Sequence, residues 1–129
     1  MVAPNFSLGA SLLIHLARFA AKFFDHAEIM EMHHDKKIDA PSGTAIATAR
    51  AMSQTHGKPF IHTKAERKII SNTRGGQMDG IAIHSLRLPG FMAGQQTRSG
   101  VIAAYPDINA LYRMSFSLSR AKASSVVIT

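Results

Sequence analysis

The sequence predicts an α+β fold in which helices pack on one mixed β-sheet. Two stretches carry apolar residues at three- and four-residue spacing, as one face of a helix does. Several short stretches alternate apolar and polar residues, as strands do, and most of them lie late in the chain. Such elements must bury their apolar faces, and a layer of helices on a sheet satisfies this requirement. A chain of 129 residues can form one core of this kind, so we expect a single domain over residues 1–129.

The first helix is expected between Asn5 and Asp25, with Asn5 or Ser7 as its N-cap. Its apolar residues at helical spacing are Leu8, Leu12, Leu16, Phe19, Ala20 and Phe23. The polar residues that interrupt this stretch are Ser11, His15, Arg18 and Lys22. These interruptions argue against a membrane span or a signal-peptide core, and they are typical of an amphipathic helix.

A strand is expected from Glu28 to His33, ending in a pair of histidines. The HDKKIDAPSG segment that follows contains Pro, Gly and several charged residues, which indicate a loop. The second helix is expected from Thr44 to about His56, and a Gly and a Pro shortly after it should end it. One face of this helix carries Ala45, Ile46, Ala49 and Met52.

Residues 58–79 are expected to form a loop that contains one short strand, with a turn at Gly75–Gly76. The GIAIHSLR segment that follows alternates cleanly and should be a strand. Its two faces would carry Ile81, Ile83 and Ser85 on one side and Ala82, His84 and Leu86 on the other. Further strands are expected in VIAAY, ALYRMSFSL and SSVVIT, all beyond residue 95.

The chain is basic, with 15 Lys and Arg against 8 Asp and Glu, a formal net charge of +7. Residues 81–129 contain five of these bases and one acid, an excess of four. The bases are scattered rather than clustered with aromatic residues, so we do not expect nucleic-acid binding. The chain has no cysteine, which excludes disulfides, thiolate nucleophiles and Cys-based metal sites and suits a cytoplasmic location.

Ionisable side chains are most concentrated in residues 31–45, EMHHDKKIDAPSGTA. A histidine can exchange a proton near neutral pH, and Lys37, four residues after His33, can hold a carboxylate or stabilise developing negative charge. The segment then enters a helix through Ser42 or Gly43, and backbone N–H groups at a helix start favour anions. Together these features indicate proton transfer to a small anionic substrate, although a capped helix start after a solvated loop is the simpler alternative.

A metal site is the competing interpretation of the paired histidines. Successive side chains of an extended strand end point to opposite sides, so His33 and His34 are poorly placed to chelate one ion. Other ligands would come from Asp35, Asp39 or His62, at spacings that match no standard ligand pattern. We therefore expect no metal. We also expect Arg87 to be a surface cation.

The motif resembles the hallmark of the 4-hydroxy-tetrahydrodipicolinate reductases (dihydrodipicolinate reductases), E-x-H-H-x-x-K-x-D-A-P-S-G-T-A. Every fixed position of that string is present between Glu31 and Ala45. The opening APNFSLGASLL resembles the family's crossover into its substrate domain, and DGIAIHSLRLPGFMA resembles a later strand and turn. The resemblance covers residues 1–93. It implies an α+β substrate-binding domain whose sheets pack together in a homotetramer.

The resemblance also implies roles for individual residues. His33 and Lys37 would be catalytic, and His34, Gly43 and Thr44 would bind a small dicarboxylate substrate. The residues at the nicotinamide cofactor, NADPH or NADH, would be Ala3, Pro4, Asn5 and Phe6. The family acts in lysine and diaminopimelate biosynthesis by moving a hydride from that cofactor to the substrate ring.

The chain departs from the family in two places. No G-x-G-x-x-G loop occurs among its nine glycines, so we expect the nucleotide-binding domain to be absent and the chain alone to be inactive. Residues 95–129 do not show the family's later motifs and are expected to be a replaced terminus. Two other function classes stay open: a non-catalytic oligomerisation or anion-binding module, and, less favoured, a basic nucleic-acid binder that uses this terminus.

Overall fold

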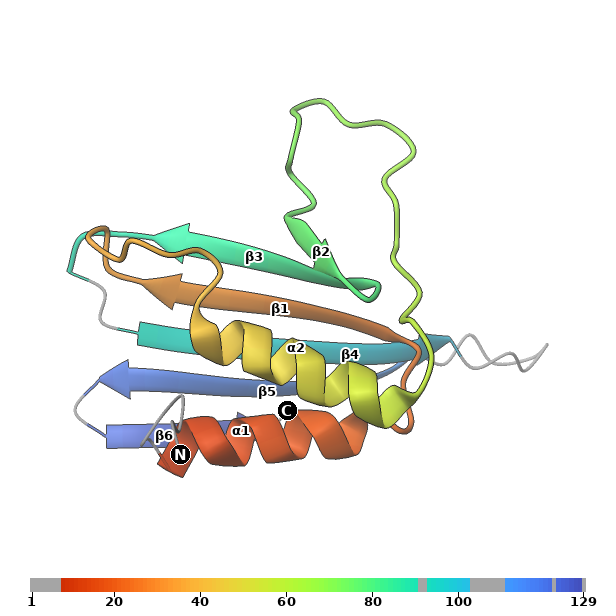
Figure 1. Ribbon diagram of the computed structural model, residues 1–129, viewed down its shortest axis with the longest axis horizontal. Coiled ribbons are helices and arrows are strands. Elements are labelled where there is room, and N and C mark those ends of the chain that lie inside the picture. Colours follow the sequence, from red (N-terminus) through yellow and green to blue (C-terminus); the bar gives the residue numbers. More distant parts are fainter. Residues whose placement is uncertain (1–7, 91–92, 103–110, 122, 129) are drawn as a thin grey trace.

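The structure, a computed structural model, describes residues 8–90, 93–102, 111–121 and 123–128 (Figure 1). The elements in chain order are α1 (Leu8–Ala20), β1 (His26–His33), α2 (Gly43–His56), β2 (Gly76–Met78), β3 (Ile81–Arg87), β4 (Ala93–Ile102), β5 (Leu111–Ala121) and β6 (Ala123–Ile128). The described strands form one sheet in the order β2-β3-β1-β4-β5-β6. Only β1 and β3 pair in parallel among these neighbours, so the sheet is mixed. The α+β prediction is confirmed.

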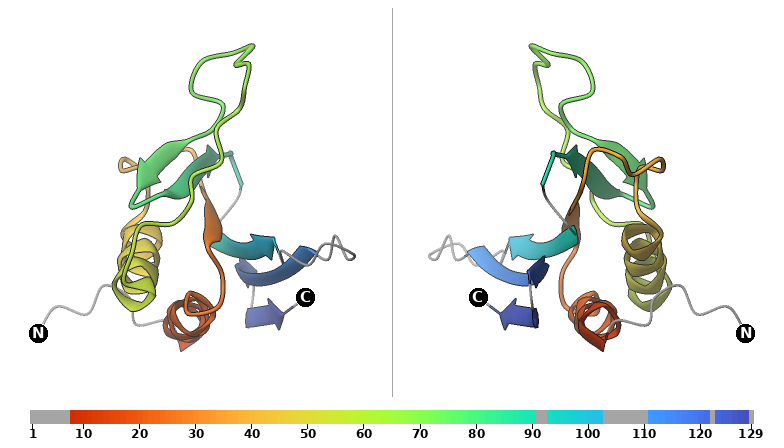
Figure 2. Two further views of the ribbon diagram at one scale, coloured as in Figure 1. Left: turned by 90° about the vertical axis from the view of Figure 1, so that its right-hand side faces the viewer. Right: turned by 90° about the vertical axis from the view of Figure 1, so that its left-hand side faces the viewer.

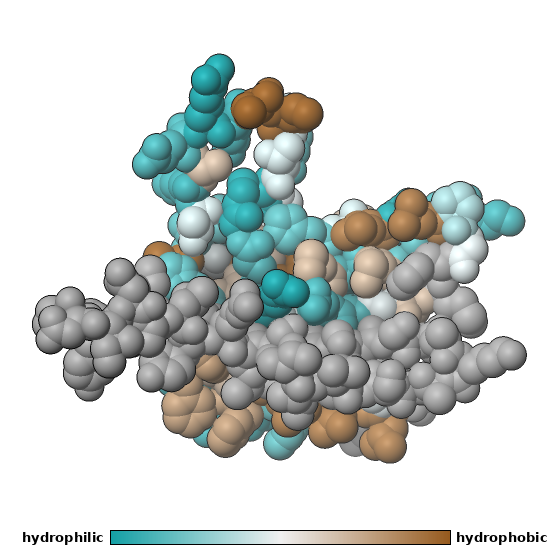
Figure 3. Space-filling model, turned by 180° about the vertical axis from the view of Figure 1, so that it is seen from behind, coloured by the Kyte–Doolittle hydropathy of each residue, from teal (hydrophilic) through white to brown (hydrophobic). Residues whose placement is uncertain are grey.

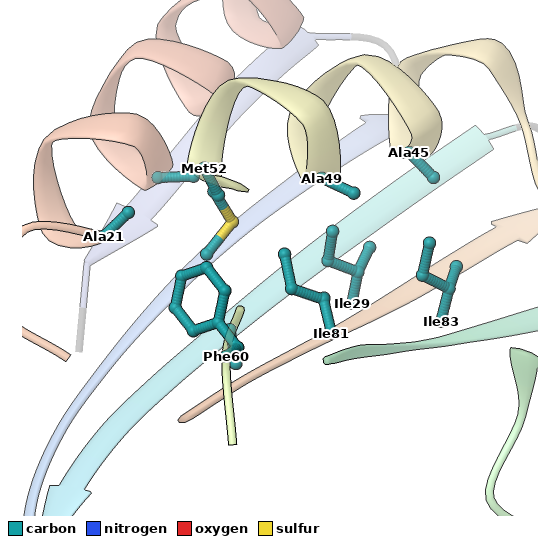
Figure 4. Close-up of a cluster of buried hydrophobic side chains, with 10 residues drawn as sticks. Ala21, Ile29, Ala45, Ala49, Met52, Phe60, Ile81 and Ile83 are labelled. Atoms are coloured by element: carbon teal, nitrogen blue, oxygen red, sulfur yellow. The ribbon is translucent and has the colours of Figure 1, made fainter. Parts of the chain in front are cut away.

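Both helices lie on one face of the sheet (Figures 1 and 2). Helix α2 contacts β1, and α1 contacts α2 together with β5 and β6. The main core lies between these layers, where small residues of the helices meet branched residues of the central strands (Figure 4). Its members are Ala17, Ala21, Ala27, Ile29, Ala45, Ala49, Met52, Phe60, Ile81 and Ile83. None of the described helices is long and apolar enough to cross a membrane.

Helix α1 buries a face that coincides only in part with its predicted apolar residues. The buried positions within it are Gly9, Ala10, Leu13, Ala17 and Ala20. Leu8, Leu12 and Phe19 are exposed, as is Phe23 just beyond the helix. Small residues allow the backbone of α1 to approach α2 and the sheet closely, which explains why the Gly and Ala positions face inward. The helix was predicted correctly; of its predicted apolar residues Ala20 is buried and Leu16 packs against the core, whereas the other four are exposed. The expected N-caps, Asn5 and Ser7, lie outside the described residues.

The ends of α2 follow the predicted capping pattern. Ser42 is the N-cap, and its hydroxyl oxygen accepts a hydrogen bond from the backbone N–H of Ala45 at 3.3 Å. Gly57 closes the helix in the left-handed conformation, at φ 75°, and its N–H donates to the carbonyl of Ser53. The residues buried from α2 are Ala45, Thr48, Ala49 and Met52, whereas Ile46 is only half-buried.

Strand β4 begins earlier than the VIAAY segment that predicts it, and residues 103–110 lie outside the described residues. Its inward positions are polar, which hides the alternation expected of a strand. Gln95, Thr97 and Ser99 are all buried, opposite Glu31, Ile29 and Ala27 of β1. The Gln95 amide donates to the Thr48 hydroxyl of α2 at 2.8 Å, so this polar row faces the helices.

The segment between α2 and β2 is a loop that protrudes from the body of the molecule (Figure 1). Hydrophobic residues gather at the end of the projection (Figure 3), and Ile69 and Ile70 are among its exposed apolar side chains. The expected short strand is β2, which starts at Gly76 directly after the Gly75 turn. Arg74 anchors the base of the loop by an ion pair with Glu28 of β1.

Candidate functional site

The candidate site lies where the parallel strands β1 and β3 end. Because parallel neighbours run in the same direction, their carboxyl ends meet at one edge of the sheet. His33, the last residue of β1, pairs in register with Arg87, the last residue of β3. The backbone N–H of Leu88 donates to the His33 carbonyl at 3.1 Å. The loop that follows β1 leads into α2 from this edge (Figure 1).

A buried ion pair joins the two strands one step inside this edge. The Glu31 side chain is fully buried, and both of its carboxylate oxygens accept hydrogen bonds from the Arg87 guanidinium, at 2.8 and 3.0 Å. The Arg87 side chain is 19% exposed. The expectation that Arg87 is a surface cation was wrong, because a buried carboxylate on β1 requires a cation beside it.

The His33 ring lies against the same carboxylate. Its Nδ1 is 2.5 Å from Oε2 of Glu31, the oxygen that also accepts a hydrogen bond from Arg87. An ionised carboxylate only accepts hydrogen bonds, so Nδ1 must donate the proton in this contact. Nε2 is then the ring nitrogen left to exchange a proton with a ligand.

Arg87 also reaches the loop that carries Lys37. Its guanidinium donates to the backbone carbonyl of Asp39 at 2.7 Å. The Lys37 ammonium lies 2.6 Å from Oδ1 of Asp39, and this hydrogen bond is the main reason that the pKa of Asp39 lies below its usual value. The Lys37 backbone N–H bonds the His34 carbonyl, which closes a turn. These hydrogen bonds connect the loop that carries His34 and Lys37 to the end of strand β3.

Gly43 and Thr44 form the start of α2, as expected, directly after the Ser42 N-cap. The amino end of a helix carries a partial positive charge and favours anions. A Cβ atom placed on Gly43 would meet nothing within 4 Å, so the space beside this helix start is open. His34 is exposed in the loop just before it. Ala3, Pro4, Asn5 and Phe6, expected at the nicotinamide cofactor, lie outside the described residues.

A cavity of about 410 Å³ adjoins this region, which is within the size range of small-molecule sites. It is lined by Ala40, Pro41, Asn72, Gly75, Gly76, Ile83 and Ser85. The cavity therefore connects the loop before α2 with strand β3 and the base of the protruding loop. No group of three His, Asp or Glu side chains in the described part of the chain is arranged to hold a metal ion.

A second polar cluster occupies the opposite face of the sheet. Glu28 of β1 pairs with Arg74, and its Oε2 lies 3.0 Å from Nε2 of His84 on β3. Side chains at alternate strand positions point to opposite faces, so this cluster is separated from Glu31 by the sheet itself. It holds the protruding loop and supplies no group to the site.

The sequence contained a signal for the Glu31–Arg87 pair. Ala27, Ile29 and Glu31 occupy alternate positions of β1, and the first two are apolar. A carboxylate at the third inward position has to be paired, and a neighbouring strand end that offers Arg87 could have been recognised as its partner.

Glu31 should make stability depend on pH. Burial alone would raise the pKa of Glu31, but hydrogen bonds from Arg87, Ser85 and His33 outweigh it and hold that pKa below the usual 4.5. The unfolded state then binds the proton more readily, so this contribution to stability is complete above pH 4.5 and is lost as the pH falls through the native value. We expect the urea midpoint of Glu31→Gln to fall less steeply below pH 4.5 than the midpoint of the wild type does. The matched control is Glu66→Gln in the exposed loop; an unchanged slope in Glu31→Gln would contradict the prediction.

Comparisons with known proteins identify the family of the chain. Residues 9–109 match the family model described as dihydrodipicolinate reductase, C-terminus. Over 100 residues the chain is 51% identical to the 4-hydroxy-tetrahydrodipicolinate reductases of Dehalococcoides mccartyi and Moorella thermoacetica, covering 78% of this chain and 37% of each relative. A solved structure, a dipicolinate-bound dihydrodipicolinate reductase from Paenisporosarcina sp. TG-14, is 41% identical with a TM-score of 0.72. That match covers 88% of this chain and 41% of the other. The chain therefore spans less than half the length of these relatives.

Proposed function

Because the chain belongs to the dihydrodipicolinate reductase family, whose C-terminal region it matches over residues 9–109, we propose that it is the substrate-binding and catalytic part of a 4-hydroxy-tetrahydrodipicolinate reductase. Such an enzyme would act in lysine and diaminopimelate biosynthesis in the cytoplasm. The observation that carries the proposal is the contact between His33 and the buried Glu31, at the edge where Lys37 and the start of α2 also lie.

The substrate in this proposal is a small ring dicarboxylate. The solved relative is named as dipicolinate-bound, and dipicolinate carries two carboxylates on one ring. In this chain the open start of α2 at Gly43 and Thr44 supplies backbone N–H groups and the positive end of the helix dipole. Lys37 and His34, from the loop before it, supply side-chain donors. These groups would hold the two carboxylates and fix the ring against the strand ends.

His33 and Lys37 would provide the proton that the ring needs as it accepts a hydride. His33 offers Nε2 for that transfer because its Nδ1 is engaged by Glu31. Lys37, in the loop held by Arg87, would stabilise negative charge as it develops.

The hydride would come from NADPH or NADH. The residues expected to contact that cofactor, residues 3–6, are not described, and the 129 residues contain no G-x-G-x-x-G loop. We expect that the 129-residue chain by itself does not turn over substrate.

We also expect self-association. The helices cover one face of the sheet (Figure 2), and the opposite face carries half-buried Met30 and Met32 and exposed Leu86. This face would pack against further copies in a homotetramer, as the resemblance implies. Analytical sedimentation should give a mass of four chains, and a monomer at all concentrations would contradict this part of the proposal.

The substrate site is tested by calorimetric titration of the chain with pyridine-2,6-dicarboxylate. We expect Lys37→Ala to weaken binding about tenfold or more, since a charged hydrogen-bond donor is lost. Lys36→Ala, which removes the same charge from the neighbouring exposed position, is the matched control and should bind as the wild type does.

Gly43→Ala is a second test of the proposed substrate site. A methyl group at Gly43 meets open space in the protein, so the variant should keep the wild-type urea midpoint. The same methyl group would occupy space next to the proposed carboxylate and should weaken binding. If the wild-type chain does not bind the dicarboxylate, or if Lys37→Ala and Gly43→Ala bind it unchanged, the proposed site is wrong. The non-catalytic module would then be the favoured alternative.

A further inference from the structure

The Arg87 side chain contacts two parts of the candidate site, Glu31 on strand β1 and Asp39 in the loop before α2. Its guanidinium donates to both carboxylate oxygens of Glu31, and it donates to the backbone carbonyl of Asp39. Glu31 contacts the His33 ring, and Asp39 bonds Lys37. The proposed function gives the chemistry to His33 and Lys37, and it does not say how the Glu31–Arg87 pair acts on these two side chains together.

From this arrangement we propose that Arg87 and Glu31 are positioning residues that fix the two catalytic side chains relative to each other. This inference rests on the proposed function and deepens it. Glu31 holds the His33 ring with Nδ1 toward the protein and Nε2 toward the ligand. Arg87 holds Glu31 and, through the Asp39 carbonyl, the loop that places Lys37.

The geometry of the pair supports positioning rather than a general gain in stability. An ion pair with a buried carboxylate contributes little net stability, because the desolvation of the charges offsets their attraction. A guanidinium presents five donors in a rigid planar fork, whereas an ammonium presents three rotatable donors on a single nitrogen. Arg87 uses this property, since separate donors meet the Glu31 oxygens, the Asp39 carbonyl and the Leu86 carbonyl.

The Glu31 carboxylate also determines the tautomer of His33. A neutral imidazole carries its proton on one nitrogen only, and a carboxylate 2.5 Å from Nδ1 selects the Nδ1–H form. Without that acceptor, the ring is free to rotate and to exchange between both neutral tautomers. A group that only stabilised the fold would not leave this signature on the His33 nitrogens.

The test uses the full 129-residue chain and the double variant Glu31→Met/Arg87→Met. Replacing both charges with apolar side chains of similar length leaves no unpaired buried charge, so the variant should fold with a midpoint near the wild-type value. In long-range ¹H–¹⁵N spectra at a pH where His33 is neutral, the wild-type ring should be in the Nδ1–H form. The double variant should show a mixture of both tautomers, and it should bind pyridine-2,6-dicarboxylate about tenfold more weakly.

Arg87→Lys separates the two tasks of the guanidinium. Lysine can still pair with Glu31, so His33 should keep the Nδ1–H form. It cannot also bridge to Asp39, so backbone ¹⁵N relaxation should show greater motion of the 37–40 loop than in the wild type. If the folded double variant keeps the wild-type His33 nitrogen spectrum, or if the 37–40 loop is unchanged in Arg87→Lys, the inference is overturned. The tautomer measurement needs no ligand, so it distinguishes failure of this inference from failure of the proposed substrate site.

Discussion

Replacing Arg87 with methionine alone is expected to lower the free energy of unfolding by about 3–5 kcal/mol at neutral pH. The substitution removes the partner of Glu31, which is fully buried and cannot regain water without opening the sheet edge. The remaining carboxylate must then either stay charged and unpaired or take up a proton. Urea unfolding followed by circular dichroism measures this loss.

The cycle of single and double variants shows whether the loss comes from the pair. Glu31→Met/Arg87→Met should be much more stable than the sum of the two single variants predicts, because it leaves no unpaired charge. The cost of Arg87→Met should also shrink as the pH is lowered and Glu31 becomes protonated. Additive single effects, or a cost below about 1 kcal/mol at neutral pH, would contradict the burial of this pair.

Gly80→Ala is expected to destabilise the protein by about 3 kcal/mol or more. Gly80 has φ 84°, a conformation that L side chains rarely adopt, and it lies in the turn between β2 and β3. An added Cβ would lie 1.8 Å from the Phe60 carbonyl oxygen and 2.6 Å from its carbonyl carbon. Phe60 is a core residue whose N–H bonds the Asp79 carbonyl, so this backbone cannot move away without disturbing the core.

Gly57→Ala is the matched control for this substitution. Gly57 also has a positive φ, 75°, but a Cβ there would meet nothing within 4 Å. It should therefore lose only the cost of the left-handed conformation, about 1 kcal/mol. Equal losses in the two variants would show that the close approach of Gly80 to Phe60 does not exist in solution.

Much of the fold follows from local patterns in the sequence. The alternation of Ile81 and Ile83 with polar or small residues predicts β3, and the Ser42 and Gly57 caps predict the limits of α2. The buried face of α1 could not be predicted in this way. Most of its large apolar residues are exposed, and tertiary packing buries Leu13 together with Gly9, Ala10, Ala17 and Ala20, which let the helix approach its neighbours closely.

The residues of the candidate site could be named from the sequence, but their contacts with one another could not. The spacing of His33, Lys37 and Gly43 is visible in the sequence, whereas the partners that order them come from a distant strand. Arg87 lies 56 residues from Glu31, and their contact exists because β1 and β3 pair in parallel and in register. Long-range pairing of this kind is set by the topology of the sheet rather than by local spacing.

The start of strand β4 was not predicted because its buried residues are polar. Gln95, Thr97 and Ser99 lack the apolar alternation by which a strand is recognised in a sequence.

We propose that this chain holds a ring dicarboxylate at the start of α2, beside the strand end that carries His33. The most direct measurement is a map of backbone amide shifts during titration of the ¹⁵N-labelled chain with pyridine-2,6-dicarboxylate. We expect saturable shifts at Lys37, Gly43 and Thr44, with no change around the Glu28–Arg74–His84 cluster on the other face of the sheet. Shifts confined to the Glu28–Arg74–His84 cluster, or no saturable shifts at the start of α2, would contradict binding at this site.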